Sequence, residues 1–137
     1  MATSTITSAP TTTTTCATCA PKPALDARPL LSAPEAARLA ATFKVLANDS
    51  RLRLLHALAR AGELCVTDLA TEVGMGVPAV SNQLARLQDQ RILVARRDGN
   101  RIYYRITDAC VPRLLELGWC LAEDAASTTV ARAGVAR

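Results

Sequence analysis

The five cysteines of this 137-residue chain are its most chemically active side chains, and they fall into three groups. Cys16 and Cys19 form a Cys-x-x-Cys pair, Cys65 stands alone, and Cys110 and Cys120 are ten residues apart near the C-terminus. A cysteine thiolate is both a strong nucleophile and a ligand for soft metal ions. All five are therefore candidate ligands, and their reversible oxidation is the alternative chemistry.

Spacing limits which of these thiols can share an ion. In a helix, Cys110 and Cys120 would lie about 15 Å apart along the axis and about 80° apart around it, so one chain cannot close a site with both. Cys110 of one subunit could instead approach Cys120 of a second subunit if their helices run antiparallel across a two-fold axis. Cys65 precedes a predicted helix whose dipole favours a thiolate, although burial as a small apolar residue is the alternative.

A second group of reactive side chains is a run of arginines between residues 91 and 105. The segment RILVARRDGNRIYYRI carries five arginines against one acid, and Asp-Gly between two strand-forming runs is typical of a β-hairpin. Guanidinium groups on such a hairpin can bind phosphates or enter the minor groove of DNA. The alternative is a solvated edge hairpin that its charges protect from aggregation. The candidate DNA contacts are Arg96, Arg97, Asn100 and Arg101.

The residues just before this hairpin predict a helix-turn-helix. Thr67 is expected to cap a short helix over residues 68–73, Gly74-Met75-Gly76 makes a turn, and a second helix spans about residues 77–90. One face of that second helix is apolar, with Val80, Leu84 and Leu87. Two packed helices are common, and it is the basic hairpin directly after them that favours DNA binding. The expected DNA-reading residues of the second helix are Val77, Ala79, Ser81, Asn82, Gln83 and Arg86.

The rest of the chain supplies the frame for these residues. Residues 1–31 are rich in Thr, Ala, Ser and Pro and are expected to form a flexible arm. A folded domain is expected over residues 32–126, with helices over about 32–47 and 49–61 and a last helix from about residue 108. Residues 127–137 are expected to fray. The faces expected to be apolar are Leu39, Phe43 and Leu46 on the first helix, and Leu52, Leu55 and Leu58 or Ala59 on the second, facing inward.

The predicted fold class is therefore mainly α with a small β-hairpin, in the order of four helices, two strands and one helix. Half of the residues are apolar but only 3% are aromatic, so Ala, Leu and Val must form the core. The length suits one domain with a modest core.

Charge and composition narrow the functional class. The formal net charge is +4, and most of the excess lies around the hairpin, which suits an anionic partner. No apolar run approaches the ~18 residues that cross a membrane and no secretory signal is visible, so we expect a cytoplasmic protein without a membrane partner. Neither a nucleotide-binding loop nor a catalytic triad is visible, and the Cys16–Cys19 pair lacks the context of a thiol oxidoreductase. We expect no enzyme activity and no organic cofactor.

Four segments, ANDSRLRLLHAL, ELCVTDLA, VSNQLARL and RRDGNRIYYRI, together resemble the ArsR/SmtB family. The likeness covers roughly residues 31–123. It implies a homodimeric winged helix-turn-helix repressor that responds to a metal or metalloid, with the first and last helices at the dimer interface. It also implies that the helix from Val77 enters the major groove of a double-stranded, imperfectly palindromic operator. Ser81 and Asn82 stand where the family has Ser and His, and Asn can pair with adenine.

The resemblance also implies where an ion would bind. Thiolate sensors of the family have ELCVCDL where this chain has ELCVTDL, so Cys65 is kept and Thr67 replaces the second cysteine. Arm cysteines, here Cys16 and Cys19, complete that site in some members. The family's zinc-type site on the last helix is matched by Asp108 with Cys110 and by Cys120 with Glu123, where thiols replace imidazoles. Such ligands favour the arsenite, cadmium or lead class of ions over zinc. A repressor that senses oxidants or persulfides through the same thiols is the alternative.

Overall fold

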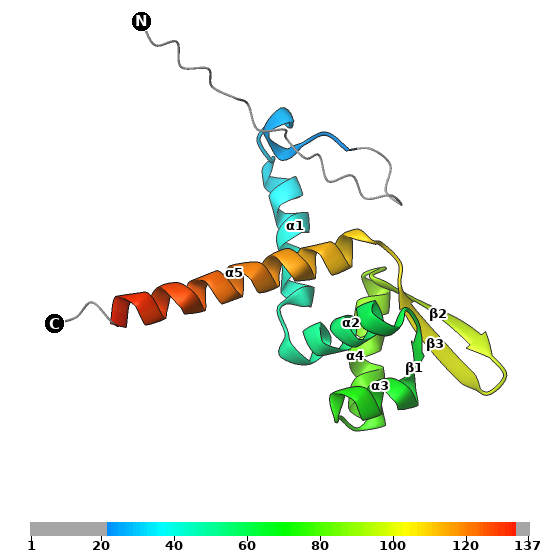
Figure 1. The fold of residues 1–137 in the computed structure, drawn as a ribbon. Helices are drawn as coiled ribbons and strands as arrows, with labels where there is room; N and C mark the ends of the chain where they lie inside the picture. Colours follow the sequence, from blue (N-terminus) through cyan, green and yellow to red (C-terminus); the bar gives the residue numbers. More distant parts are fainter. Residues whose placement is uncertain (1–21, 134–137) are drawn as a thin grey trace, which may run out of the picture.

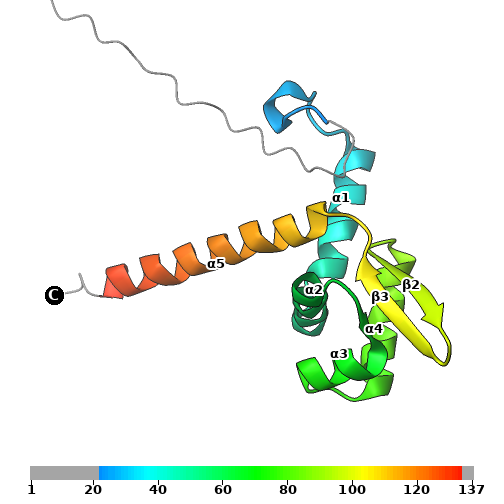
Figure 2. The same ribbon diagram turned by 45° about the vertical axis from the view of Figure 1, so that its right-hand side comes forward.

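In the computed structural model, which describes residues 22–133, three helices pack against a small sheet, and two further helices extend from them (Figure 1). Helices α2, α3 and α4 with the sheet form the head. Helix α5 leaves the head and runs outward in both views (Figures 1 and 2). The elements in chain order are the 3-10 helix η1 (Leu25–Ala27), α1 (Ala33–Leu46), α2 (Asp49–Ala61), β1 (Leu64–Cys65), α3 (Val66–Val73), α4 (Val77–Asp89), β2 (Leu93–Asp98), β3 (Arg101–Ile106) and α5 (Cys110–Ala133).

The first two long helices begin at side-chain caps, close to the starts that the sequence predicts. At the start of α1 the Ser32 hydroxyl accepts the backbone N–H of Glu35, while the Glu35 carboxylate accepts the backbone N–H of Ser32 at 2.9 Å. The Asn48 side chain likewise accepts the backbone N–H of Arg51 at 3.0 Å at the start of α2. Gly62 ends α2 with φ of +84°, a conformation that a side chain would strain.

Helix α3 begins earlier than the sequence predicts. Its N-cap is Cys65 and its first residue is Val66, so the prediction of a Thr67 cap before residue 68 is wrong. The reason is that residues 64–65 form the short strand β1, from whose end the chain enters the helix directly. A strand of only two residues shows no alternation, and the sequence gives no signal for it.

The sheet is antiparallel, with the order β1-β3-β2. Strand β3 therefore lies between its hairpin partner β2 and β1, and Tyr103 pairs with both Arg96 and Cys65. Asp98 belongs to β2 and pairs with Arg101, so the loop is only Gly99-Asn100. Gly99 adopts φ of +60°, as a two-residue hairpin loop requires.

The core lies between α2, α3, α4 and the sheet. On α4 the buried residues are Val80, Leu84 and Leu87, as predicted from their spacing. Leu52 on α2 is 38% exposed, so its expected inward position is wrong, and Leu54 is buried there instead. Helix α2 contacts α3, α4, α5 and β3, so its buried sector is wide enough to include two successive positions. The fully buried side chains of the core are Leu54, Leu55, Leu58, Leu69, Val80, Leu84 and Leu87.

Helices α1 and α5 bury little of their apolar surface in the described chain. Leu46 is the buried residue of α1, whereas Leu39 and Phe43 are 46% and 49% exposed. Helix α5 continues to Ala133, so the expected fraying from residue 127 is not what the structure has. The hydroxyls of Ser127 and Thr128 donate to carbonyls one turn earlier, which lets these polar residues stay helical. No helix within residues 22–133 is both long and apolar enough to cross a membrane.

Candidate nucleic-acid interface and candidate metal site

Helix α4 turns most of the predicted DNA-reading residues away from the core. Gly76, its N-cap, provides no side-chain cap, so the first backbone N–H groups are not taken up by a capping side chain. Such groups attract phosphate. Of the predicted residues, Val77, Ala79, Asn82 and Arg86 are exposed, and Ser81 and Gln83 are half-buried.

Gln83 is already engaged within the protein. Its side-chain oxygen accepts a hydrogen bond of 2.9 Å from the guanidinium Nη1 of Arg51 on α2. Arg51 also donates through Nε to the backbone carbonyl of Val45 in the last turn of α1, at 2.5 Å. No local pattern in the sequence singles out Arg51, because its partners come from two other helices.

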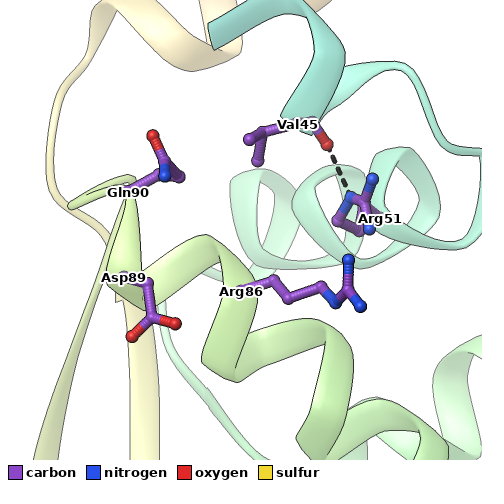
Figure 3. Close-up of a pocket in the computed structure, with 5 residues that line it drawn as sticks. All are labelled: Val45, Arg51, Arg86, Asp89 and Gln90. Carbon is purple, nitrogen blue, oxygen red and sulfur yellow. Dashed lines mark hydrogen bonds between the residues drawn. The ribbon is translucent and has the colours of Figure 1, made fainter. Parts of the chain in front are cut away.

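A shallow cavity of about 180 Å³ lies beside this arrangement, between α1, α2 and α4 (Figure 3). The side chains of Arg51 and Arg86 extend toward one another in this view, whereas Asp89 points away from them. The Arg86 side chain forms no hydrogen bond or ion pair with any residue from 22 to 133. It is therefore available to an external anion. Val45, Arg51, Arg86, Asp89 and Gln90 line the cavity.

We define the wing as strands β2 and β3 with their loop. Its predicted DNA contacts fall into two groups. Arg96 donates through Nε to both carboxylate oxygens of Glu63, at 2.8 and 2.9 Å, and its guanidinium lies 4.6 Å from the centre of the Tyr103 ring. Asp98 lies 3.6 Å from the same group. The hydrogen bond from Arg96 lowers the pKa of Glu63, and Glu63 in turn raises the pKa of Arg96. The bonds between Arg96 and Glu63 therefore connect the wing to the rest of the head.

Arg97, Asn100 and Arg101 are exposed at the end of the wing. Arg97 pairs with Ile102 and Arg101 pairs with Asp98, and successive strand residues point to opposite faces. The two arginines therefore put positive charge on both faces of the hairpin. A hydrogen bond with the Tyr103 side chain raises the pKa of Arg101.

Cys65 is buried in the head and contacts neighbouring side chains, with little access to solvent. It is 2% exposed, and its Sγ lies 3.2 Å from the Thr67 hydroxyl and donates to the Asp68 carboxylate at 3.1 Å. Both partners lie in the first turn of α3, which Cys65 caps. The polar first turn of α3 could have indicated these contacts, whereas the burial depends on pairing with β3.

Cys110 and Cys120 are exposed on α5. Cys110 is its first residue, with a backbone N–H that donates to Asp108 at 2.8 Å, and the Cys120 thiol points to the Asp124 carboxylate at 4.0 Å. Cys16 and Cys19 lie outside the described residues. Within residues 22–133 no three His, Cys, Asp or Glu side chains come together as a metal site would require. The described part of one chain therefore brings no predicted ligand set together.

Comparison with known proteins places this arrangement among bacterial regulators. Residues 48–94 match the family model described as "Bacterial regulatory protein, arsR family". The chain is 45% identical over 85 residues to a "Transcriptional repressor SmtB homolog" of Synechocystis, covering 62% of this chain and 64% of that protein. It is 43% identical to the regulator NmtR of Mycobacterium tuberculosis, covering 63% of this chain and 71% of that protein. The chain spans about 64% of the length of the first curated relatives that it matches.

Solved structures show the same fold. The antimony-specific transcriptional repressor AntR is 62% identical and has a TM-score of 0.68, and the match covers 80% of this chain and 98% of AntR. The homodimeric winged helix-turn-helix domain Mb0332 of Mycobacterium bovis is 38% identical with a TM-score of 0.59, covering 69% of this chain and 89% of that one. The predicted winged helix-turn-helix class is thereby confirmed.

Proposed function

The chain belongs to the ArsR/SmtB family of bacterial transcriptional regulators, and from this premise we propose that it is a homodimeric repressor whose DNA is released by a trivalent metalloid. The metalloid would be antimonite or arsenite, bound to cysteine thiolates. One observation carries the proposal. Helix α4 and the basic wing, which would read DNA, lie at one end of the chain's fold, and the exposed thiols lie on a separate helix, α5.

The DNA-binding half of the proposal rests on α4 and the wing. An α-helix fits the major groove, where Asn82 would pair with a base and Arg86 would contact a phosphate. Arg97 and Arg101 on the two faces of the wing would contact the neighbouring backbone or minor groove. Most of these contacts are electrostatic, so affinity should fall steeply with salt.

Dimerisation is supported by the apolar residues that α1 and α5 expose. Leu39 and Phe43 on α1, and Leu117, Trp119 and Leu121 on α5, are between 46% and 71% exposed in the single chain. Large apolar side chains exposed on both of these helices support a protein interface there. A two-fold axis there would set two α4 helices about 34 Å apart, which matches an imperfectly palindromic operator with half-sites one helical turn apart.

The choice of a metalloid rests on the cysteines and on the AntR likeness. AntR is antimony-specific and shares 62% of aligned residues with this chain. Cys110 and Cys120 lie about 15 Å apart along α5, so each would pair with the other thiol of the partner subunit. Such a site would join the two subunits at the surface that sets the spacing of the reading helices. Cadmium and lead are the other thiophilic candidates, and Cys16, Cys19 or Cys65 would supply any third ligand.

Release would follow if the ion prefers a dimer geometry in which the two heads no longer match the grooves. A coupling free energy of about 1–3 kcal/mol changes operator affinity about 5–150-fold. Because thiols must lose their protons to bind, the response should weaken as the pH falls.

The test is fluorescence anisotropy of the full-length protein on DNA from upstream of its own gene. Antimonite, arsenite, cadmium, lead, copper(I) and zinc are titrated against the wild type and against Cys110→Ser, Cys120→Ser, Cys65→Ser and Cys16→Ser/Cys19→Ser variants. We expect antimonite or arsenite to release the DNA, and either α5 variant to abolish release. A wild type that no thiophilic ion releases would refute the metalloid proposal.

Mixing the Cys110→Ser and Cys120→Ser proteins tests whether the site spans the dimer. A mixed dimer keeps one intact pair, formed by Cys110 of one subunit with Cys120 of the other. We expect partial recovery of metalloid binding in the mixture, whereas ligands confined to one chain would show no recovery. Intact mass of the treated protein separates an added ion from oxidation, which removes two protons, and from persulfidation, which adds sulfur.

A further inference from the structure

Helix α1 is attached to the head by few buried contacts. It buries one residue, Leu46, and its apolar Leu39 and Phe43 point to solvent. Its last turn also receives a polar contact, because the Nε of Arg51 donates to the backbone carbonyl of Val45 at 2.5 Å. A helix held at one end by so little can pivot unless a directional bond fixes it.

The same guanidinium reaches the reading helix. Nη1 of Arg51 donates to the side-chain oxygen of Gln83 at 2.9 Å, although the two residues are 32 positions apart. In the view of Figure 3, the side chain of Arg86 on α4 extends toward Arg51, which is bonded to the Val45 carbonyl. Arg51 is itself held in place, because its backbone N–H donates to the Asn48 cap.

We propose that Arg51 is a positioning residue that fixes the angle between α1 and the reading helix α4, through simultaneous bonds to the Val45 carbonyl and the Gln83 amide. The proposal rests on the proposed function, in which α1 forms part of the dimer interface. If that interface fixes the positions of the two heads, the Arg51 bridge fixes the orientation of each α4 relative to the interface. The Gln83 side chain then orients α4 through its hydrogen bond with Arg51, inside the protein.

The chemistry of arginine suits this role. A guanidinium is planar, with donors that leave it in fixed directions and no acceptor, so the Gln83 atom that faces it must be the amide oxygen. The two bonds use different nitrogens of one rigid group. A lysine at position 51 offers a single ammonium on a flexible stem and could not hold both acceptors at a defined angle.

The first experiment measures how DNA affinity depends on half-site spacing. Full-length wild type, Arg51→Met and Arg51→Lys are titrated on operator duplexes whose centre is lengthened or shortened by one and two base pairs, and on a duplex with one half-site. The control is Arg53→Met, which removes the same charge from an exposed position of α2. We expect wild type and Arg53→Met to prefer one spacing, and both Arg51 variants to lose about tenfold of that preference while half-site affinity is unchanged.

A different result overturns the proposal. If Arg51→Met weakens binding equally on every duplex and reduces the salt dependence by about one phosphate contact, Arg51 binds the DNA backbone directly. Gln83→Met and the double variant complete a cycle. The loss in the double variant should match that of Arg51→Met alone, whereas losses that add would show that the Arg51–Gln83 bond does not carry the effect.

A second measurement needs no DNA. Hydrogen–deuterium exchange is followed by mass spectrometry in peptides covering residues 43–47 of α1 and residues 66–73 of α3. We expect Arg51→Met to speed exchange in the α1 peptide by about tenfold and leave the α3 peptide unchanged. Equal exchange of the α1 peptide in wild type, Arg51→Met and Arg51→Lys would refute the bridge. A wild type that binds no DNA would count against the proposed function, while this comparison would still decide the role of Arg51.

Discussion

At the scale of single residues, the wing contains arginines of two kinds, and the difference predicts two mutational phenotypes. Arg97 and Arg101 are exposed and form no ion pair within residues 22–133, whereas Arg96 is bonded to the Glu63 carboxylate and lies over the Tyr103 ring. We expect Arg97→Gln and Arg101→Gln each to weaken binding across all DNA sequences and to reduce the salt slope by about 1. Arg96→Gln should leave that slope nearly unchanged. Anisotropy titrations at several salt concentrations measure this, and an equal slope loss in all three variants would contradict it.

The Glu63–Arg96 pair should also make the wing sensitive to acid. Arg96 lowers the pKa of Glu63 below its ordinary value of 4.5, so the pair contributes stability above that pH and loses it as the pH falls through the lowered pKa. We expect the protection of amides in β2 and β3, measured relative to their intrinsic exchange rates at each pH, to fall below about pH 4.5 in the wild type. Glu63→Gln should show the faster exchange already at neutral pH. Exchange that is the same in both proteins at neutral pH would rule out a role for this pair.

Cys65 shows why the candidate metal site could be predicted only in part. Its place before a helix is visible in the sequence, but its burial comes from β1 pairing with Tyr103, a residue far along the chain. Its contacts with the side chains of Thr67 and Asp68 favour a structural role in the first turn of α3. We expect Cys65→Ser, which keeps a hydrogen-bond donor at this position, to retain metalloid release of DNA, and Cys65→Val, which removes it, to lower thermal stability. Loss of release in a folded Cys65→Ser protein would instead identify Cys65 as a ligand.

At the scale of elements, local signals predicted the helices well and long-range pairing poorly. The side chains that start α1 and α2 and the spacing of Val80, Leu84 and Leu87 are local, and the predicted starts of the two helices and the buried face of α4 agree with the structure. Strand β1 was missed because it exists only through β3. The end of α5 was misjudged because Ser and Thr suggest fraying unless their hydroxyls bond back to the helix.

The buried face of α4 predicts the cost of disturbing the head. Leu84 is fully buried in the core formed with α2 and α3. Leu84→Ala should lower the free energy of unfolding by about 2–5 kcal/mol, because it removes apolar contacts and leaves a cavity. Urea denaturation followed by circular dichroism measures the loss. Leu121→Ala, at a position 71% exposed in one chain, is the matched control and should cost far less within a monomer.

At the scale of the whole molecule, the single tryptophan reports on both dimerisation and ion binding. Trp119 is 68% exposed, donates to Glu123 at 2.8 Å and precedes Cys120. We expect its emission to shift to shorter wavelength as protein concentration passes the dimer dissociation constant, and to change again on antimonite addition. Leu121→Glu should suppress the first change and Cys120→Ser the second. Emission that ignores concentration, while sedimentation shows a dimer, would place the interface elsewhere.

The outer part of α5 has a consequence for how such regulators diversify. Only its beginning, with Val111, Leu114 and Leu115, packs against the core, and the head contains every residue proposed to read DNA. In the proposed dimer, substitutions on α5 that leave its apolar residues Leu117, Trp119 and Leu121 in place would therefore change ligand chemistry without altering the residues that contact the promoter. An engineer could graft new thiol, imidazole or carboxylate patterns onto the remaining positions of this helix, keeping one genetic output for many chemical signals.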